Sequence, residues 1–480
     1  MESGGLDADT ATQALYAGKV VGAAYPPLDV ARLRFFGGTT NHWDGHCAPF
    51  DAIDFEKRPW VPYSGWPNTL ADLQPFYVRA QDVCELGPCE YRPEKWRDAL
   101  PGLIGFEPGR LVNRLWQFST PTRFGQHYRD ALGGAPNVHV LLNANVVEIV
   151  ANDDATTVRA LRLSSIEGRT GTIRAGVFVL ACGGIENPRL LLASNRVMQN
   201  GLGNGHDLVG RFFLEHPHAL LAFALPQVPL ERHAVYYGNF PAANTDSRAT
   251  FQAKPGLSEQ VQRQEGLLNC CIDVGWGYQR SPGYLKFREV VKALARGRAP
   301  DDMGRAVLTI PGDLGGLAEG LYRRIRDQNL FWFASSPEQA PNPDSRVTLD
   351  MERDALGMPR VKLDWRLSAP DKATARRTCR LVGEEFARLG LGRMRLDDWL
   401  LADDTTWEGL SVRYHHMGTT RMSDDPQQGV VDRHCRVHGI DNLYVAGSSA
   451  FTTSGYANPT LTIVALAVRL ADHLKGGDVH

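Results

Sequence analysis

The chain has 480 residues, of which 43% are hydrophobic and 22% charged, and its formal net charge is −2. This composition is typical of a globular protein and argues against a mainly disordered chain, while the near-zero charge gives no basic face for nucleic acid or an anionic membrane. At this length, two interleaved domains or one large enzyme fold are expected.

The amino-terminal sequence shows no targeting or membrane signal. No run reaches the ~20 apolar residues that span a bilayer, and the residues after Met1 lack the basic and apolar regions of a signal peptide. The chain as written is therefore predicted to be cytoplasmic. A missing N-terminal segment would make the periplasm an alternative.

Residues 2–5 look like the end of the second strand of a dinucleotide-binding fold, where an acidic residue, here Glu2, accepts hydrogen bonds from the adenosine ribose. The G-x-G-x-x-G turn that should precede this strand does not occur in the sequence. Such a turn holds the pyrophosphate through backbone amides and a helix dipole. We therefore expect that roughly 30 residues, the size of one βαβ unit, are missing before Met1. The alternative interpretation is a merely disordered start.

The next notable stretch is a glycine pair followed by small polar residues and an aromatic residue. Glycine permits close approach of the backbone to a ligand, and threonine and asparagine supply hydrogen-bond donors. We predict that this stretch contacts a ligand; the alternative is a tight loop whose last two side chains simply pack. Its candidate residues are Gly37, Gly38, Thr39, Asn41, His42 and Trp43.

Four apolar segments predict strands that together form a β-meander. They are residues 138–142, 146–150, 158–163 and 172–180. The last strand runs into Ala181, Gly183 and Gly184, and a helix is predicted over residues 186–193. A strand, a glycine turn and a helix in succession form a second place where the backbone can approach a cofactor.

Between residues 204 and 403, amphipathic strands alternate with longer irregular stretches. Residues 346–349 and 361–365 predict a hairpin, because two strand-like runs flank a turn with aspartate and glycine. Ser368 is predicted to begin a helix as its hydroxyl cap, followed by proline and an acid.

Two further features of this region have competing interpretations. His216 and His218 form a His-x-His pair, but no carboxylate or cysteine cluster accompanies them, so no metal site is predicted. Basic residues gather at residues 284–298 and 322–326. They indicate either a solvated helix face, which we favour, or a docking surface for an electron-accepting partner or a membrane interface.

An apolar strand near the carboxyl terminus, at residues 442–445, runs into Gly447 and Ser448. A mostly apolar helix then follows Asn458-Pro459-Thr460, and such a helix should be buried. Asparagine before proline is typical of a helix start, with Asn458 as the N-cap and Pro459 at the first helical position.

His415 is the candidate base of the chain, because an unperturbed imidazole has a pKa of ~6.5, close to operating pH. Its neighbour His416 is easily mistaken for it. Adjacent residues of an extended segment point in opposite directions, so only one of the two should face a bound ligand.

Taken in order, these motifs resemble the glucose-methanol-choline (GMC) oxidoreductase family, in particular the branch with pyranose oxidase and bacterial sugar or polyol dehydrogenases. The similarity covers nearly the whole chain, from Glu2 to about His473. It implies an α/β fold (α+β overall) with an N-terminally truncated, Rossmann-like FAD-binding domain and a substrate domain built on an antiparallel sheet. The implied ranges are 1–203 and 404–480 for the FAD-binding domain and 204–403 for the substrate-binding domain.

The resemblance also implies a chemistry. His415 would take the hydroxyl proton of an alcohol while hydride passes to flavin N5, and Asn458 would pair with His415. His42 is similar to the position through which pyranose oxidase attaches its flavin covalently, whereas other members with a similar loop bind FAD non-covalently. The residues that match the family's FAD contacts are Glu2, Gly37, Gly38, Thr39, Asn41, His42, Trp43, Val146, Ala181, Gly183, Gly184, Asn187, Gly447, Ser448, Asn458, Pro459 and Thr460.

The predicted function is FAD-dependent oxidation of an alcohol group in a sugar, glycoside or polyol. The predicted partners are that small-molecule substrate and an electron-acceptor protein or small subunit, with no nucleic acid. The alternatives are a truncated homologue that is non-catalytic or works with a partner chain, and a protein that uses the pocket for flavin-independent acid–base chemistry. The missing phosphate turn favours the alternatives, and the retained flavin-contact motifs favour oxidation.

Overall fold

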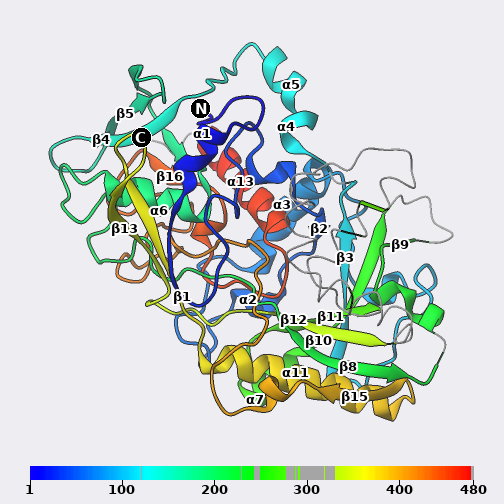
Figure 1. Ribbon diagram of the computed structural model, residues 1–480. Helices are drawn as coiled ribbons and strands as arrows, with labels where there is room; N and C mark the ends of the chain where they lie inside the picture. The colour runs from blue at the N-terminus through cyan, green and yellow to red at the C-terminus, as the bar shows by residue number, and fades with distance from the viewer. Residues whose placement is uncertain are drawn as a thin grey trace.

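Figure 1 shows the computed structural model of the chain, which describes all residues except 121, 229, 243–248, 277–286, 288–289, 292–317, 319–329 and 477–480. The basic segments at 284–298 and 322–326 lie almost entirely outside the described residues. The described part contains four sheets, and the largest is built from strands that pair antiparallel.

The largest sheet has eight strands in the order β15-β8-β12-β11-β10-β3-β2, with β9 paired to β10. Its strands are β2 (His46–Cys47), β3 (Leu111–Phe118), β8 (Leu220–Pro226), β9 (Phe240–Pro241), β10 (Thr250–Leu257), β11 (Cys270–Trp276), β12 (Phe331–Pro337) and β15 (Gly392–Leu396). Because β2 and β3 precede residue 204, the sheet draws on more of the chain than the range 204–403 predicted for the substrate domain.

Helix α11 (Ala369–Arg388) packs on this sheet and lies beside β8 and β15 in Figure 1. Its predicted start is confirmed, because Ser368 and Asp371 form a capping box. The two faces of the sheet belong to different cores, as expected from the alternation of side chains along a strand. Leu115 belongs to the same core as the buried apolar side chains of α11, whereas the adjacent Trp116 belongs to the core of the other half of the molecule.

That other half contains a parallel pair of strands, β7 (Phe178–Leu180) and β16 (Leu443–Val445). Helix α6 (Gly183–Ala193) follows β7, and α13 (Thr460–Lys475) follows β16 after a loop. Five apolar side chains of α13 are buried, and its Thr462 hydroxyl is hydrogen-bonded to Tyr77 of α3 (Leu70–Val83) at 2.8 Å. The predicted buried C-terminal helix is therefore present.

An antiparallel meander stands beside the parallel pair. Its strands are β4 (Asn145–Ala151), β5 (Val158–Ser164) and β6 (Thr170–Ile173). The strand predicted at 138–142 is wrong: these residues form no strand, and the carbonyl of Leu141 accepts the backbone N–H of Glu2 at 2.8 Å. The strand predicted at 172–180 is in fact two, since the chain leaves β6 before entering β7.

The predicted hairpin is confirmed as β13 (Arg346–Arg353) and β14 (Pro359–Trp365), which pair antiparallel. A strand that we did not predict, β1 (Gly18–Gly22), pairs parallel with β14. Elsewhere, an ion pair with both side chains fully buried joins Arg58 to Glu338, directly after β12. The N-terminal region is therefore bound to the sheet that contains β13 and β14 and to the end of a strand of the eight-stranded sheet.

The other described elements are short. They are α1 (Thr10–Gln13), η1 (Ala14–Tyr16), η2 (Gly38–Asn41), α2 (Ala52–Phe55), η3 (Pro93–Lys95), α4 (Phe124–His127), α5 (Arg129–Gly134), η4 (Leu230–Tyr236), α7 (Glu259–Glu265), α12 (Asp398–Leu401) and η5 (Ser448–Ala450). None of the described helices is both long and apolar enough to cross a membrane.

Candidate active site

Two extended segments meet where the two halves of the molecule face each other. Leu214 forms an antiparallel bridge with Met417, and His218 forms one with Ser411. Between these bridges the rings of His216 and His415 are perpendicular, and their Nδ1 atoms lie 2.7 Å apart. The pairing of the segments therefore fixes a direct contact between two imidazoles.

The buried carboxylate of Glu215 holds this arrangement in place. It accepts the backbone N–H of His415 at 2.9 and 3.0 Å, the backbone N–H of His216 at 2.8 Å and the hydroxyl of Tyr25 at 2.9 Å. Burial raises the pKa of Glu215 to about 7, although these hydrogen bonds lower it. The carboxylate thus ties the backbones of both histidines to one point.

Asn458 completes the contact from the loop before α13. Its Nδ2 lies 3.3 Å from Nε2 of His415, and its Oδ1 accepts the indole N–H of Trp116 at 3.0 Å. The prediction that Asn458 caps the helix is wrong, because α13 begins at Thr460 with Pro459 as its N-cap residue. The amide of Asn458 is instead engaged by two side chains from distant parts of the chain.

His415 is half-buried, and its pKa lies well below the usual value. Burial is the main cause, and the neighbouring His216 and the positive charge of Arg413 act in the same direction. His415 is therefore a neutral imidazole at neutral pH. His416 points elsewhere, packing near Tyr25 and Phe213.

Three charged side chains lie close to His415: Lys254 on β10, Asp273 on β11 and Arg413. Lys254 Nζ is 2.7 Å from Asp273 and 4.0 Å from the centroid of the Trp116 ring, and Arg413 is 2.5 Å from the same carboxylate. These cations hold the pKa of Asp273 well below its usual range despite burial. Burial and the same cations lower the pKa of His46 to about 3, so this imidazole is also neutral.

The predicted glycine turns lie at the carboxyl ends of β7 and β16. Ala181 and Gly183 are exposed, and Gly183 has a φ of +87° with open space where a Cβ would point. Gly447 has a φ of +111° and is open in the same way. Ligands of parallel sheets bind at the carboxyl ends of the strands, so these bare turns fit a dinucleotide such as FAD.

Both turns are locked to the segment that carries the histidine. A Cβ on Gly184 would lie 2.2 Å from the carbonyl oxygen of His416, so only glycine fits there. Ser448 donates to that same carbonyl at 2.6 Å, and the hydroxyl of Thr419 donates to the Gly184 carbonyl at 2.6 Å. The structure therefore brings Gly184 and Ser448 next to the catalytic candidates.

Asn187 has a different place from the one the resemblance implies. It is fully buried, its Oδ1 accepts the backbone N–H of Cys182 at 2.9 Å, and its Nδ2 donates to Ser449 Oγ at 2.9 Å. Its amide thus joins the two glycine turns and leaves no group free for a ligand. Thr460, at the start of α13, is half-buried, and Pro459 is buried.

The predicted N-terminal candidates form a second group of residues. The Glu2 carboxylate accepts the backbone N–H of Gly4 at 2.8 Å, and Val146 on β4 is half-buried. Arg34 links this region to α6 through Glu186 at 3.4 Å and to β4 through the Asn145 side chain at 3.2 Å.

In the loop that contains η2, some of the predicted side chains are exposed to solvent and others are hydrogen-bonded to the protein backbone. Thr39 and His42 are exposed, whereas the Asn41 amide donates to Phe36 O and the Trp43 indole donates to Thr122 O. Gly37 has a φ of +92°, and a Cβ there would meet the backbone of Gly125 at 2.5 Å. A Cβ on Gly38 would have ordinary contact with one atom, the Leu33 carbonyl oxygen at 4.0 Å. The loop therefore offers exposed polar groups on a backbone that requires glycine.

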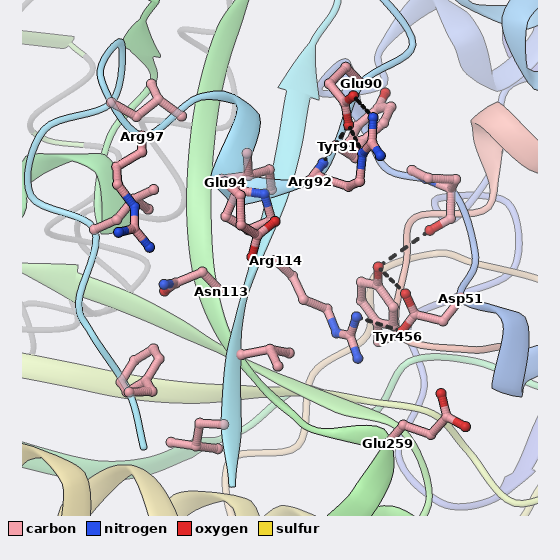
Figure 2. Close-up of a pocket in the computed structure, with 18 of the residues that line it drawn as sticks. Asp51, Glu90, Tyr91, Arg92, Glu94, Arg97, Asn113, Arg114, Glu259 and Tyr456 are labelled. Carbon is pink, nitrogen blue, oxygen red and sulfur yellow. Dashed lines mark hydrogen bonds and ion pairs between the residues drawn. The ribbon is translucent and has the colours of Figure 1, made fainter. Parts of the chain in front are cut away.

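Tyr456 is one of the residues that line a cavity of about 1100 Å³ (Figure 2). Arg114 lies over the Tyr456 ring and pairs with Asp51 at 2.6 Å. Tyr456 packs edge-on against Trp116, with ring centroids 5.4 Å apart. Trp116 and Tyr456 therefore stand between this cavity and Asn458.

Sequence reasoning missed several polar residues of the site. It considered His216 only as half of a metal motif, and it did not single out Trp116, Lys254 or Asp273. A usable signal for the last two was a charged residue inside an otherwise apolar strand. Within the described ranges, no group of three or more His, Cys, Asp or Glu side chains is arranged to hold a metal ion.

Known proteins resemble this chain both in sequence and in fold. Residues 341–467 match the family model described as GMC oxidoreductase. The chain is 25% identical to 2-methyl-1,2-propanediol dehydrogenase of Mycolicibacterium austroafricanum and 25% identical to the fructose dehydrogenase large subunit of Gluconobacter japonicus, and each match covers 92% of this chain and 80% of the relative. Pyridoxine 4-oxidase from Mesorbium loti has a similar fold, with a TM-score of 0.53 and 17% identity over 99% of this chain and 93% of that one.

Proposed function

The chain belongs to the GMC oxidoreductase family, as the sequence motifs predicted, and we propose that it oxidises an alcohol group of a sugar, glycoside or polyol with His415 as the base. The observation that carries this proposal is the contact between His415 Nε2 and the Asn458 amide beside the two glycine turns. Bound FAD would supply the hydride acceptor, flavin N5.

The residues of the site divide the work on the substrate's hydroxyl. His415 is neutral before substrate binds, because burial depresses its pKa, so a nitrogen lone pair is free to accept the hydroxyl proton. The Asn458 amide is a donor and stabilises the negative charge that develops on the substrate oxygen as that proton leaves. The 3.3 Å separation of the two groups lets one oxygen contact both.

The polar side chains near His415 support a polyhydroxylated substrate. Arg413 is partly exposed and pairs with Asp273 through only one guanidinium nitrogen, so its other donors can bind hydroxyl oxygens. His46 is neutral and half-buried, and an imidazole can both donate to and accept from a hydroxyl. The names of the two relatives, a propanediol dehydrogenase and a fructose dehydrogenase subunit, agree with this substrate class.

FAD would be held by the glycine turns, by Glu2 and by the loop from Gly37 to Trp43. We propose that FAD binds non-covalently. Covalent attachment through His42 is the alternative, since this side chain is exposed within the loop. An electron-accepting protein or small subunit is a second proposed partner, which the words "large subunit" in one relative's name support.

The test is anaerobic mixing of the FAD-loaded protein with a panel of fructose, glucose, a methyl glycoside and 2-methyl-1,2-propanediol. At least one alcohol should bleach the flavin, and His415→Ala should abolish most of that bleaching. His416→Phe is the matched control, because His416 packs among aromatic rings, and it should bleach normally. Failure to bind FAD would instead favour a non-catalytic homologue or flavin-independent chemistry.

A further inference from the structure

The site contains a chain of hydrogen bonds whose two ends have fixed polarity. It runs from Trp116 through Asn458, His415 and His216 to the carbonyl of Gly455. The indole N–H of Trp116 can only donate, and a backbone carbonyl can only accept. These two ends decide where the protons between them must sit.

The tryptophan end determines the orientation of the Asn458 amide. Its oxygen must face the Trp116 N–H, since the reversed amide would set two donors against each other. The NH₂ group is therefore directed at His415 Nε2, 3.3 Å away, and that nitrogen must carry a lone pair. The single proton of neutral His415 then resides on Nδ1.

The carbonyl end gives the same answer independently. His216 Nε2 lies 2.8 Å from Gly455 O and must therefore carry the proton of this ring. Burial lowers the pKa of His216 to about 4, so the ring is neutral and its Nδ1 can only accept. The donor that it accepts from, at 2.7 Å, is Nδ1–H of His415.

We propose that His216 is the positioning residue that holds His415 in the Nδ1–H tautomer and so keeps Nε2 as the basic nitrogen. The assignment rests on the proposed role of His415 as the base. His216 is an orienting group and not a proton relay, because the chain ends at a carbonyl that cannot take up a proton. Glu215 supports it by fixing the backbones of both histidines.

The test is the ¹⁵N NMR spectrum of histidine-labelled protein, which distinguishes a protonated from an unprotonated ring nitrogen and needs no substrate. Signals of His415 are assigned by their loss in His415→Ala. The unmodified protein should show Nδ1 protonated and Nε2 bare. Because the Asn458 amide by itself opposes a proton on Nε2, the variants at His216 are made in the Asn458→Ala background. There His216→Leu removes the acceptor and should move His415 toward the Nε2–H form, whereas His216→Asn keeps an oxygen near the Nδ1 position and should retain the Nδ1–H form.

Rates of flavin bleaching by the fastest alcohol of the panel should follow the tautomer. In the Asn458→Ala background, His216→Leu should lose a further factor of roughly a hundred or more, the contribution attributed to general bases, and His216→Asn should recover most of it. A folded Asn458→Ala/His216→Leu protein in which His415 keeps the Nδ1–H form overturns the inference. If the tautomer shifts as stated but His415→Ala bleaches at full rate, the positioning role stands and the proposed base is wrong.

Discussion

Replacing Asn458 with aspartate changes the charge beside His415 and almost nothing else. The amide nitrogen lies 3.3 Å from His415 Nε2, and the amide oxygen accepts the Trp116 indole N–H at 3.0 Å. In Asn458→Asp one carboxylate oxygen keeps the Trp116 contact, and the other takes the place of the amide nitrogen. A negative charge then faces the nitrogen that is proposed to take the substrate's proton.

The size of the effect follows from the distance. At 3.3 Å, two opposite unit charges attract by ~5 kcal/mol when the effective dielectric constant is ~20. Because ~1.4 kcal/mol corresponds to a factor of ten, protonation of His415 becomes more than ~1000-fold more favourable. The pKa of His415, which burial holds well below its usual value in the unmodified protein, is thereby raised.

A protonated His415 cannot accept a hydroxyl proton, so Asn458→Asp should be slow at neutral pH and should recover as pH rises through the raised pKa. The assay is the rate of anaerobic flavin bleaching as a function of pH. Asn458→Ala, which removes the amide without adding charge, should be slower at every pH but should keep the position of the acid limb. An acid limb that does not move in Asn458→Asp would refute the placement of the base at His415.

Three other outcomes are expected. Glu338→Gln leaves the buried Arg58 charge uncompensated and should lower the free energy of unfolding by about 3–5 kcal/mol. The control Glu259→Gln, which breaks the exposed ion pair with Arg263, should lower it by at most ~1 kcal/mol. Equal losses of the two variants in chemical denaturation would contradict a role of the buried pair in stability. Cys182 is the exposed cysteine at the first glycine turn, so added FAD should protect it from a maleimide, and unchanged labelling would argue against this cofactor site. After acid precipitation the flavin should remain in solution, and flavin in the pellet that is lost in His42→Ala would instead establish a covalent link.

The sequence predicted correctly those helices and strands that are marked by turn or capping residues close by in the chain. The hairpin β13–β14 and the cap at Ser368 followed from turn and capping residues that lie within a few positions of the strands and the helix. Residues 138–141 are exposed although their sequence is strand-like, and the Leu141 carbonyl accepts the backbone N–H of Glu2. The pairing of β1 with β14 joins segments far apart in the chain, and no local pattern reports it.

The same division applies to the site. His415 and Asn458 were predicted because their motifs resemble those of a known family, and the structure brings them together. Trp116 and His216 could not be predicted, because their roles depend on strand pairings that place distant residues against the motif. The cap assigned to Asn458 was wrong for the same reason, since the Trp116 indole takes up the amide oxygen.

The most direct test of the account is the rate at which the alcohol panel bleaches FAD bound to the unmodified protein and to His415→Ala under anaerobic conditions. The account predicts rapid bleaching by at least one sugar or polyol in the unmodified protein and a loss of roughly a hundredfold or more in the variant, the contribution expected of a general base. Equal rates in the two proteins, with FAD bound to both, would contradict it.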